Sequence, residues 1–305
     1  MTYRPICRVL AFVLFIAVVS AIASAVPNQP KKLKIYISVD MEGVVGTVTP
    51  DQLAPNGFEY QRFRDFMTKE TLAAISAAKE MGATEILVSD SHGNGENLLI
   101  EQFPKDVRIV RSWGRPLGMM AGIDSTFDAI LFIGYHASTG NTRGVIAHTF
   151  SSSHFTRVVL NGKEVSEGSF NAAIAGHFGV PVVMMSGDDA ALAEVWSQIG
   201  NIEGAETKKT LGFNSAITLT PEVSYELIGQ KVKAALGRLS DFKPYVVKTP
   251  VTLDVTFKNY RPVEMLTYLH SIQRVDSHTV RFVGKDMIEI ADFVDFLGYS
   301  PDLAP

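Results

Sequence analysis

Four segments place acidic or imidazole side chains directly after a run of apolar or β-branched residues. They are Asp40-Met41-Glu42, Asp90-Ser91-His92, Gly134-Tyr135-His136 and Gly187-Asp188-Asp189. Carboxylates and imidazoles are the ligands that zinc and similar first-row metals accept. In open α/β sheets, ligands bind outside the carboxyl ends of the strands. The pattern therefore predicts that these side chains gather at one edge of a sheet and form a metal site.

The candidate ligands are two carboxylates, Asp40 and Glu42, and two imidazoles, His92 and His136. Asp40 and Glu42 are two residues apart, so both project to one side of an extended backbone. The mixture suits zinc better than magnesium or calcium, which prefer oxygen ligands alone. Glu167 is a candidate fifth ligand. Five ligands exceed the need of one catalytic zinc, so we predict two Zn²⁺ per chain, which can activate water and polarise a carbonyl.

His148 leaves two interpretations open from the residues alone. A histidine near metals but not bound to them could move protons or steady an oxyanion. It could equally be a core histidine with a satisfied hydrogen bond. The acids Asp90, Asp188 and Asp189 are interpreted as groups that cap a helix or orient the ligands.

The elements that position these residues follow from the hydrophobic pattern. Apolar runs separated by amphipathic stretches predict strands alternating with helices, which is typical of an α/β domain with a mostly parallel sheet. Asn161-Gly162 predicts a hairpin turn. Strands are expected at 34–39, 85–88, 107–110, 129–133, 157–160, 163–165 and 181–185, and helices at 60–81 and 169–178.

The hydrophobic pattern of the sequence changes after about residue 205, where a polar stretch leads to Pro221. Pro221 suits the first turn of a helix over 221–239, and further elements are expected at 251–257, 279–283 and 286–297. We therefore predict a smaller C-terminal α+β domain. The expected organisation is a signal peptide at 1–25, a flexible lead-in at 26–32, an α/β metal-binding catalytic domain at 33–205 and the α+β domain at 206–305.

The first residues predict export. Arg4 and Arg8 precede an apolar run at 10–19, which is short for a membrane span, and Ala23-Ser24-Ala25 offers a cleavage site. We expect cleavage after residue 25 and a periplasmic or secreted protein; an uncleaved anchor is the alternative. Cys7, the one cysteine, lies within the signal peptide, so disulfides and thiolate catalysis are not expected in the mature chain.

Composition and missing motifs exclude several classes of function. The net charge is −4 with no basic stripe, so nucleic acid is not an expected partner. No second long apolar segment indicates a membrane span after cleavage. A Gly-x-Ser-x-Gly elbow, expected of many serine hydrolases, is absent.

The motifs together resemble the zinc-dependent D-aminopeptidase family of bacterial dipeptide-transport-linked enzymes. The resemblance covers residues 34 to 189 in matching order. It rests on Ser38-Val39-Asp40-Met41-Glu42-Gly43, Asp90-Ser91-His92, Gly134-Tyr135-His136-Ala137 and the Glu167 segment.

The resemblance implies an aminopeptidase that hydrolyses short peptides with an N-terminal D-amino acid, such as D-Ala-D-Ala. Export is expected from the first residues and not from the resemblance, because the best-known members of the family lack an export signal. It implies a two-zinc site in which Asp40 bridges the ions and His148 is the catalytic histidine. The remaining ligands would be Glu42, His92, His136 and Glu167. A ring-shaped homo-oligomer is also implied.

Two alternatives carry their own expectations. A two-metal phosphoesterase needs a cationic side chain near the metals, for which Arg143 is the obvious candidate. An exported solute-binding protein, which belongs to another class, needs polar contacts but no cluster of carboxylates and imidazoles.

Overall fold

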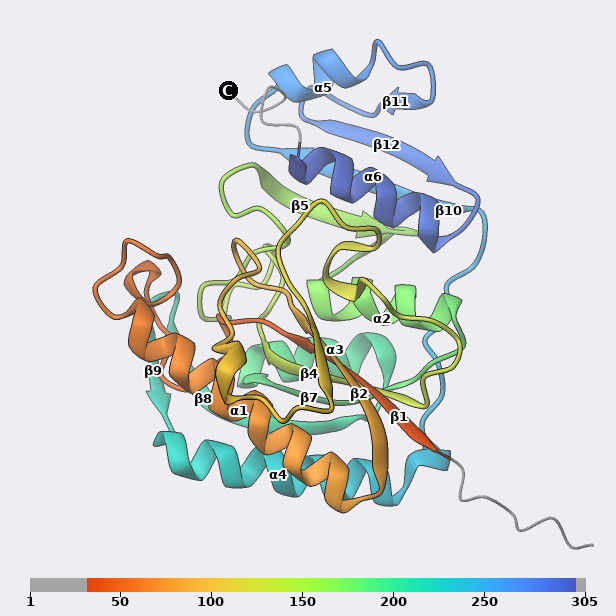
Figure 1. The fold of residues 1–305 in the computed structure, drawn as a ribbon. Coiled ribbons are helices and arrows are strands. Elements are labelled where there is room, and N and C mark those ends of the chain that lie inside the picture. Colours follow the sequence, from red (N-terminus) through yellow and green to blue (C-terminus); the bar gives the residue numbers. More distant parts are fainter. Residues whose placement is uncertain (1–31, 300–305) are drawn as a thin grey trace, which may run out of the picture. The chain divides into compact units, whose positions relative to one another are not determined.

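Seven strands form the larger sheet, in the order β3-β2-β1-β4-β7-β8-β9 (Figure 1). All neighbouring pairs are parallel except β8 and β9, which are antiparallel. The structure, a computed structural model, describes residues 32–299. The strands are β1 (Leu33–Val39), β2 (Ala83–Asp90), β3 (Val107–Val110), β4 (Ala129–Tyr135), β7 (Val182–Asp188), β8 (Glu203–Gly212) and β9 (Ser215–Thr218).

Five strands form a smaller antiparallel sheet, in the order β11-β12-β10-β5-β6. The turn between β5 and β6 contains Asn161 and Gly162, both with positive φ, as the hairpin prediction requires. The strands are β5 (Phe155–Leu160), β6 (Lys163–Glu164), β10 (Val251–Phe257), β11 (Ile272–Arg274) and β12 (Thr279–Gly284).

Six α-helices pack around these sheets within the described part of the chain. Helices α1 and α4 lie against each other and against the larger sheet, while α3 packs on β7 and β8. Helix α2 contacts β4 and also α6, so it links the two sheets. The helices are α1 (Tyr60–Glu80), α2 (Glu167–His177), α3 (Asp189–Ile199), α4 (Pro221–Gly237), α5 (Arg261–Leu266) and α6 (Met287–Tyr299).

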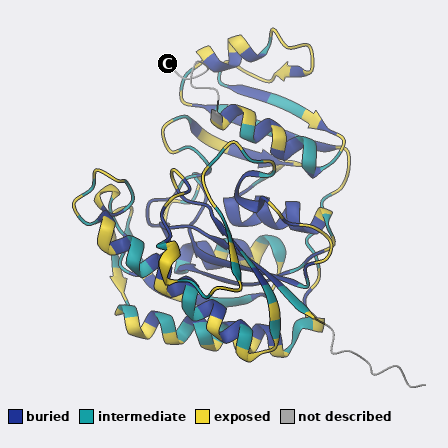
Figure 2. Cartoon of the chain, viewed as in Figure 1, coloured by how far each residue is buried: buried dark blue, intermediate teal, exposed yellow. Residues whose placement is uncertain are grey.

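The core lies at the centre of the larger sheet. Every residue of β4 and β7 is buried, which explains why the runs 129–133 and 182–185 are continuously apolar rather than alternating (Figure 2). The predicted α/β class, with a mostly parallel sheet flanked by helices and a smaller α+β part, is confirmed; the smaller part is built on the antiparallel sheet. Among the described residues, no helix has both the length and the apolarity that a bilayer crossing requires.

The predicted division at 205/206 falls inside β8, which continues the larger sheet. Residues 33–299 belong to one compact unit. The smaller sheet also takes β5 and β6 from the middle of the chain, because the Asn161-Gly162 hairpin pairs with β10. The predicted signal peptide and the lead-in up to residue 31 lie outside the described residues.

Candidate active site

Three parallel strands and one helix bring the five predicted ligands together. Asp40 and Glu42 follow β1, His92 follows β2, His136 follows β4, and Glu167 is the first residue of α2. All five side chains are buried. Ser166 caps α2 by accepting a hydrogen bond from the Ser169 N–H, which fixes the start of the helix and therefore the position of Glu167.

One group of candidate ligand atoms comes from Asp40, Glu42 and His92. The Nδ1 atom of His92 lies 3.2 Å from Oδ1 of Asp40 and 3.0 Å from Oε2 of Glu42. The three ligand atoms lie within 4.8 Å of one another.

A second group comes from Asp40, His136 and Glu167. The Nε2 atom of His136 lies 3.3 Å from Oδ2 of Asp40 and 3.5 Å from Oε2 of Glu167. These ligand atoms also lie within 4.8 Å of one another. Asp40 belongs to both groups and offers a different oxygen to each histidine.

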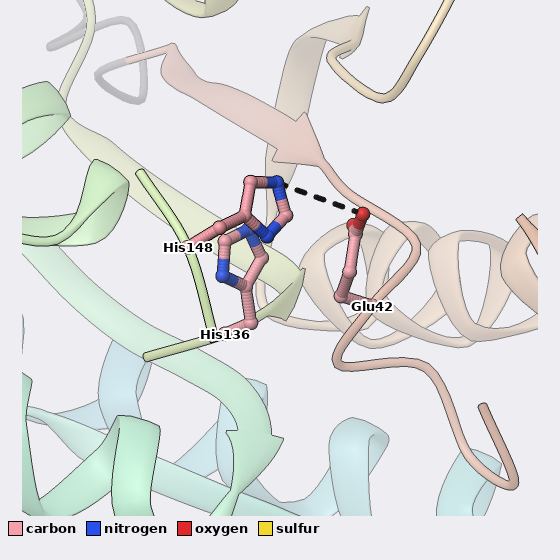
Figure 3. A group of neighbouring side chains, drawn as sticks. All are labelled: Glu42, His136 and His148. Atoms are coloured by element: carbon pink, nitrogen blue, oxygen red, sulfur yellow. Dashed lines mark ion pairs between the residues drawn. The ribbon is translucent and has the colours of Figure 1, made fainter. Parts of the chain in front are cut away.

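His148 faces the same carboxylates. Its Nε2 atom lies 3.9 Å from Oε1 of Glu42 and 3.9 Å from Oε1 of Glu167. Its ring stacks on that of His136, with centroids 4.2 Å apart, and Figure 3 shows both rings beside Glu42. His148 is only partly buried, whereas the five other side chains are buried. His148 also forms a candidate ligand group with Glu42 and His136.

The three histidines share one hydrogen-bonding arrangement. In each ring one nitrogen donates to a backbone carbonyl: His92 to Leu53, His136 to Ala137 and His148 to Ile146, at 2.9, 3.0 and 2.9 Å. A carbonyl only accepts, so the other nitrogen carries the lone pair in the neutral ring. That nitrogen points toward the carboxylates in every case, as in histidines that bind metals.

The electrostatics show a surplus of negative charge. Burial raises the pKa of Asp40, and the Glu42 charge raises it further. Burial would lower the pKa of His92, but the Glu42 carboxylate and the Asp40 hydrogen bond hold that pKa well above its usual value. Burial also opposes the charge on His136, yet Glu167 raises its pKa in the same way. Three buried carboxylates in one place are therefore stable in their ionised form only with positive charge nearby.

The residues fit a bound metal. Oδ2 of Asp40 and Nε2 of His136 are buried and make no hydrogen bond within residues 32–299. Buried polar atoms without partners are costly, and metal coordination satisfies them. The carboxylate and imidazole donors match the ligands that zinc prefers.

Comparison with known proteins agrees with this geometry. A family model described as D-aminopeptidase matches residues 33–296. The chain belongs to the D-aminopeptidase family.

Two similar proteins extend the comparison. The chain is 34% identical over 260 residues to a D-aminopeptidase from Bacillus subtilis (strain 168), with 84% of this chain and 93% of that protein covered. Its fold is similar to that of the Zn-dependent D-aminopeptidase DppA from Bacillus subtilis, described as a self-compartmentalizing protease. The TM-score is 0.83 at 32% identity, and the match covers 87% of this chain and 97% of the other. The segment matched by the D-aminopeptidase family model includes His148 and all five predicted ligands.

Acids near the ligands support the loops that carry them, as predicted. Asp90 accepts hydrogen bonds from the backbone N–H groups of Asn97 and Leu98, and Asn97 in turn donates to the His92 carbonyl. Asp188 accepts from Ala191 at the start of α3 and from the Val145 N–H, three residues before His148. These acids orient the site and do not belong to either group of ligand atoms.

Sequence reasoning missed Lys208. This lysine of β8 is buried, and its ammonium donates to the carbonyls of Glu42, Val44 and Thr47. It thus fixes the backbone that carries Glu42. A lysine in a polar, weakly patterned strand resembles a surface residue in the sequence, so only the fold reveals its role.

The strand ends approach one another too closely for a side chain at two glycines. A Cβ atom at Gly43 would lie 2.0 Å from the Tyr135 carbonyl oxygen, and one at Gly187 would lie 2.3 Å from the same atom. The absence of side chains at these positions allows the ends of β1, β4 and β7 to converge. This convergence brings Asp40 and His136 within reach of each other.

A pocket of about 560 Å³ opens onto the cluster. Asp40, Glu42, His92, Glu167 and His148 line it. The remaining walls are largely apolar and come from several loops and from α2 and α6. The pocket therefore offers a substrate-sized space beside the groups that could do chemistry.

Proposed function

We propose that this protein is a zinc-dependent aminopeptidase that hydrolyses short peptides with an N-terminal D-amino acid, such as D-Ala-D-Ala. The observation that carries the proposal is the cluster of five buried ligand side chains, four of which line one pocket together with His148. Membership of the D-aminopeptidase family and the similarity to a zinc-dependent enzyme support the activity and the metal.

We infer two zinc ions per chain. One would be held by Asp40, Glu42 and His92, and the other by Asp40, His136 and Glu167. Asp40 would bridge the two through its separate oxygens. When bound, two zinc ions supply an activated water at neutral pH and polarise the peptide carbonyl.

His148 is assigned to proton transfer. Its Nδ1–H bond to the Ile146 carbonyl leaves Nε2 free, and Nε2 faces Glu42 and Glu167 at the wall of the pocket. The neutral ring can therefore accept a proton at Nε2 from the attacking water and return it to the departing amine. His148 is also the least buried of the six side chains, which suits a group that meets substrate.

The site does not favour the alternatives. A phosphoesterase would hold its phosphate with cationic side chains, yet none of the described residues that line the pocket is lysine or arginine. Arg143 is exposed and does not line the pocket. A solute-binding protein does not require a buried cluster of carboxylates and imidazoles.

We further propose that residues 1–25 direct export and that the mature enzyme works in a periplasm or outside the cell. The basic and apolar segments at the start of the chain support this location. A ring-shaped homo-oligomer is proposed because the similar DppA structure is described as self-compartmentalizing.

The decisive experiment uses the mature protein without residues 1–25. Zinc per chain is measured by elemental analysis, and cleavage of D-Ala-D-Ala is compared with cleavage of L-Ala-L-Ala. The proposal expects about two zinc ions per chain and cleavage of the D-peptide alone. Purified protein that binds zinc but cleaves neither peptide would contradict the proposed activity while leaving the metal site in place.

A further inference from the structure

The pocket extends beyond the metal cluster to the last helix. Ala291, Val294 and Asp295 of α6 form part of its wall. Large apolar side chains form much of the wall, so a hydrocarbon chain can lie along it. These apolar residues are Leu117, Met119, Phe150, Phe170, Ile174 and Val294.

The backbone around this pocket adopts conformations that bulky residues rarely take. Leu117, Ile146 and Phe150 have φ values of 65°, 49° and 60°, and all three line the pocket. Positive φ is unfavourable for such side chains, and positions of this kind cluster at functional sites. The wall is therefore shaped at a cost to backbone energy, which indicates a binding surface.

The carboxylate of Asp295 is positioned by its contact with the turn at Gly118. A Cβ atom at Gly118 would lie 2.6 Å from its Oδ1 atom, so the backbone of Gly118 passes directly beside the carboxylate. A backbone hydrogen bond from Gly118 reaches the same carboxylate. The side chain is thus fixed toward the pocket by the turn that also carries Leu117.

The surroundings of Asp295 favour the binding of a positively charged ligand group. Burial raises its pKa to about 6, and the charge of Asp292 on the same helix adds to the rise. The Gly118 N–H and Arg115 act in the opposite direction but more weakly. No described residue of the lining itself is lysine or arginine.

We propose that this pocket binds a substrate side chain with an aliphatic stem and a terminal amine, and that Asp295 pairs with the amine. The preferred substrates would then be D-aminoacyl peptides containing a lysine-like residue. This inference rests on the proposed function and adds a substrate class to it.

The test uses two matched pairs of peptides that differ only in the amine. D-Lys-D-Ala is compared with D-norleucine-D-Ala, and D-Ala-D-Lys with D-Ala-D-norleucine. In at least one pair, kcat/KM should favour lysine by about tenfold, the lower end of the range for a hydrogen bond to a charged group. Asp295→Asn should abolish that preference by lowering kcat/KM for the lysine peptide to the level of the norleucine peptide.

Asp292→Asn is the matched control, because it removes an exposed charge from the same helix without touching the pocket lining. The lysine preference should survive in this variant. Equal cleavage within both pairs, or a preference that persists in Asp295→Asn, would overturn the inference. Cleavage of none of the four peptides would instead overturn the proposed function, and the inference with it.

Discussion

The Nε2 atom of His136 lies 3.3 Å from Oδ2 of Asp40, and within residues 32–299 neither atom makes a hydrogen bond. The other oxygen of Asp40 faces His92. One carboxylate therefore connects two histidines that come from different strands. This arrangement is what a bridging ligand requires, and it makes Asp40 the most informative position to change.

Replacing Asp40 should remove more zinc than replacing any other ligand. Asp40→Ala takes one ligand from each proposed ion, whereas Glu42→Ala takes one ligand from one ion. Elemental analysis should therefore find less zinc in Asp40→Ala than in Glu42→Ala. The exposed Asp241→Ala serves as a control with full zinc content. Equal zinc content in the Asp40 and Glu42 variants would count against the bridging role.

His148→Ala should lower kcat while the zinc content stays the same. Loss of a general acid or base costs about 100-fold or more in rate. The measurement combines steady-state kinetics with zinc analysis of the same preparation. Because His148 also lies within ligand distance of Glu42 and His136, loss of zinc in this variant would show that it is a ligand instead.

Lys208→Met should destabilise the protein. The change removes an ammonium that binds the carbonyls of Glu42, Val44 and Thr47, and leaves them buried. The Val44 carbonyl keeps the hydrogen bond from the Thr47 N–H, but the carbonyls of Glu42 and Thr47 lose their donor. These unpaired buried acceptors make a loss of about 3 kcal/mol in the free energy of unfolding the expected result. Denaturant titration measures it. Its exposed neighbour offers the control Lys209→Met, which should unfold like the wild type; equal stability of the two variants would refute the anchoring role.

Glu70→Gln should change how stability depends on pH. Burial raises the pKa of Glu70 to about 7, although hydrogen bonds from Ser224 and Val45 and the charge of Lys208 oppose the rise. The folded state therefore holds this proton more tightly than the unfolded chain does. The contribution of the Glu70 carboxyl to the stability of the folded state is complete below its unfolded pKa near 4.5. That contribution is lost as the pH rises through 7.

Relative to the wild type, Glu70→Gln should gain stability between pH 5 and pH 8, on the order of 3 kcal/mol. The difference between variant and wild type removes the contribution of other titrating groups. Chemical denaturation at several pH values measures it. Glu222→Gln, an exposed change on α4, should follow the wild type throughout. A pH-independent difference for Glu70→Gln would show that its carboxyl does not titrate in this range.

The sequence predicted the ligand cluster because parallel strands end at a common edge. Asp40, His92 and His136 each follow such a strand, so their neighbourhood follows from topology. Glu167 was harder to place, since it begins a helix after the Asn161-Gly162 hairpin. Its position depends on how that hairpin joins the second sheet.

Other parts of the site could not be predicted from local patterns. Lys208 lies in β8, which was not predicted. The polar sequence of β8 gives little sign that this segment is a strand of the larger sheet. Asp295 lies in a helix that was predicted, but nothing in that helix indicates which pocket it faces. Both roles depend on contacts between segments that are far apart in the chain.

The order of these segments along the chain has a consequence for biosynthesis. The five candidate metal ligands are made first, between residues 40 and 167, whereas α6 adds its part of the pocket wall only at residues 287–299. A growing chain therefore acquires its candidate metal ligands before the pocket beside them is complete. Peptide cleavage must then await the last helix, so a chain truncated before α6 lacks a finished binding site.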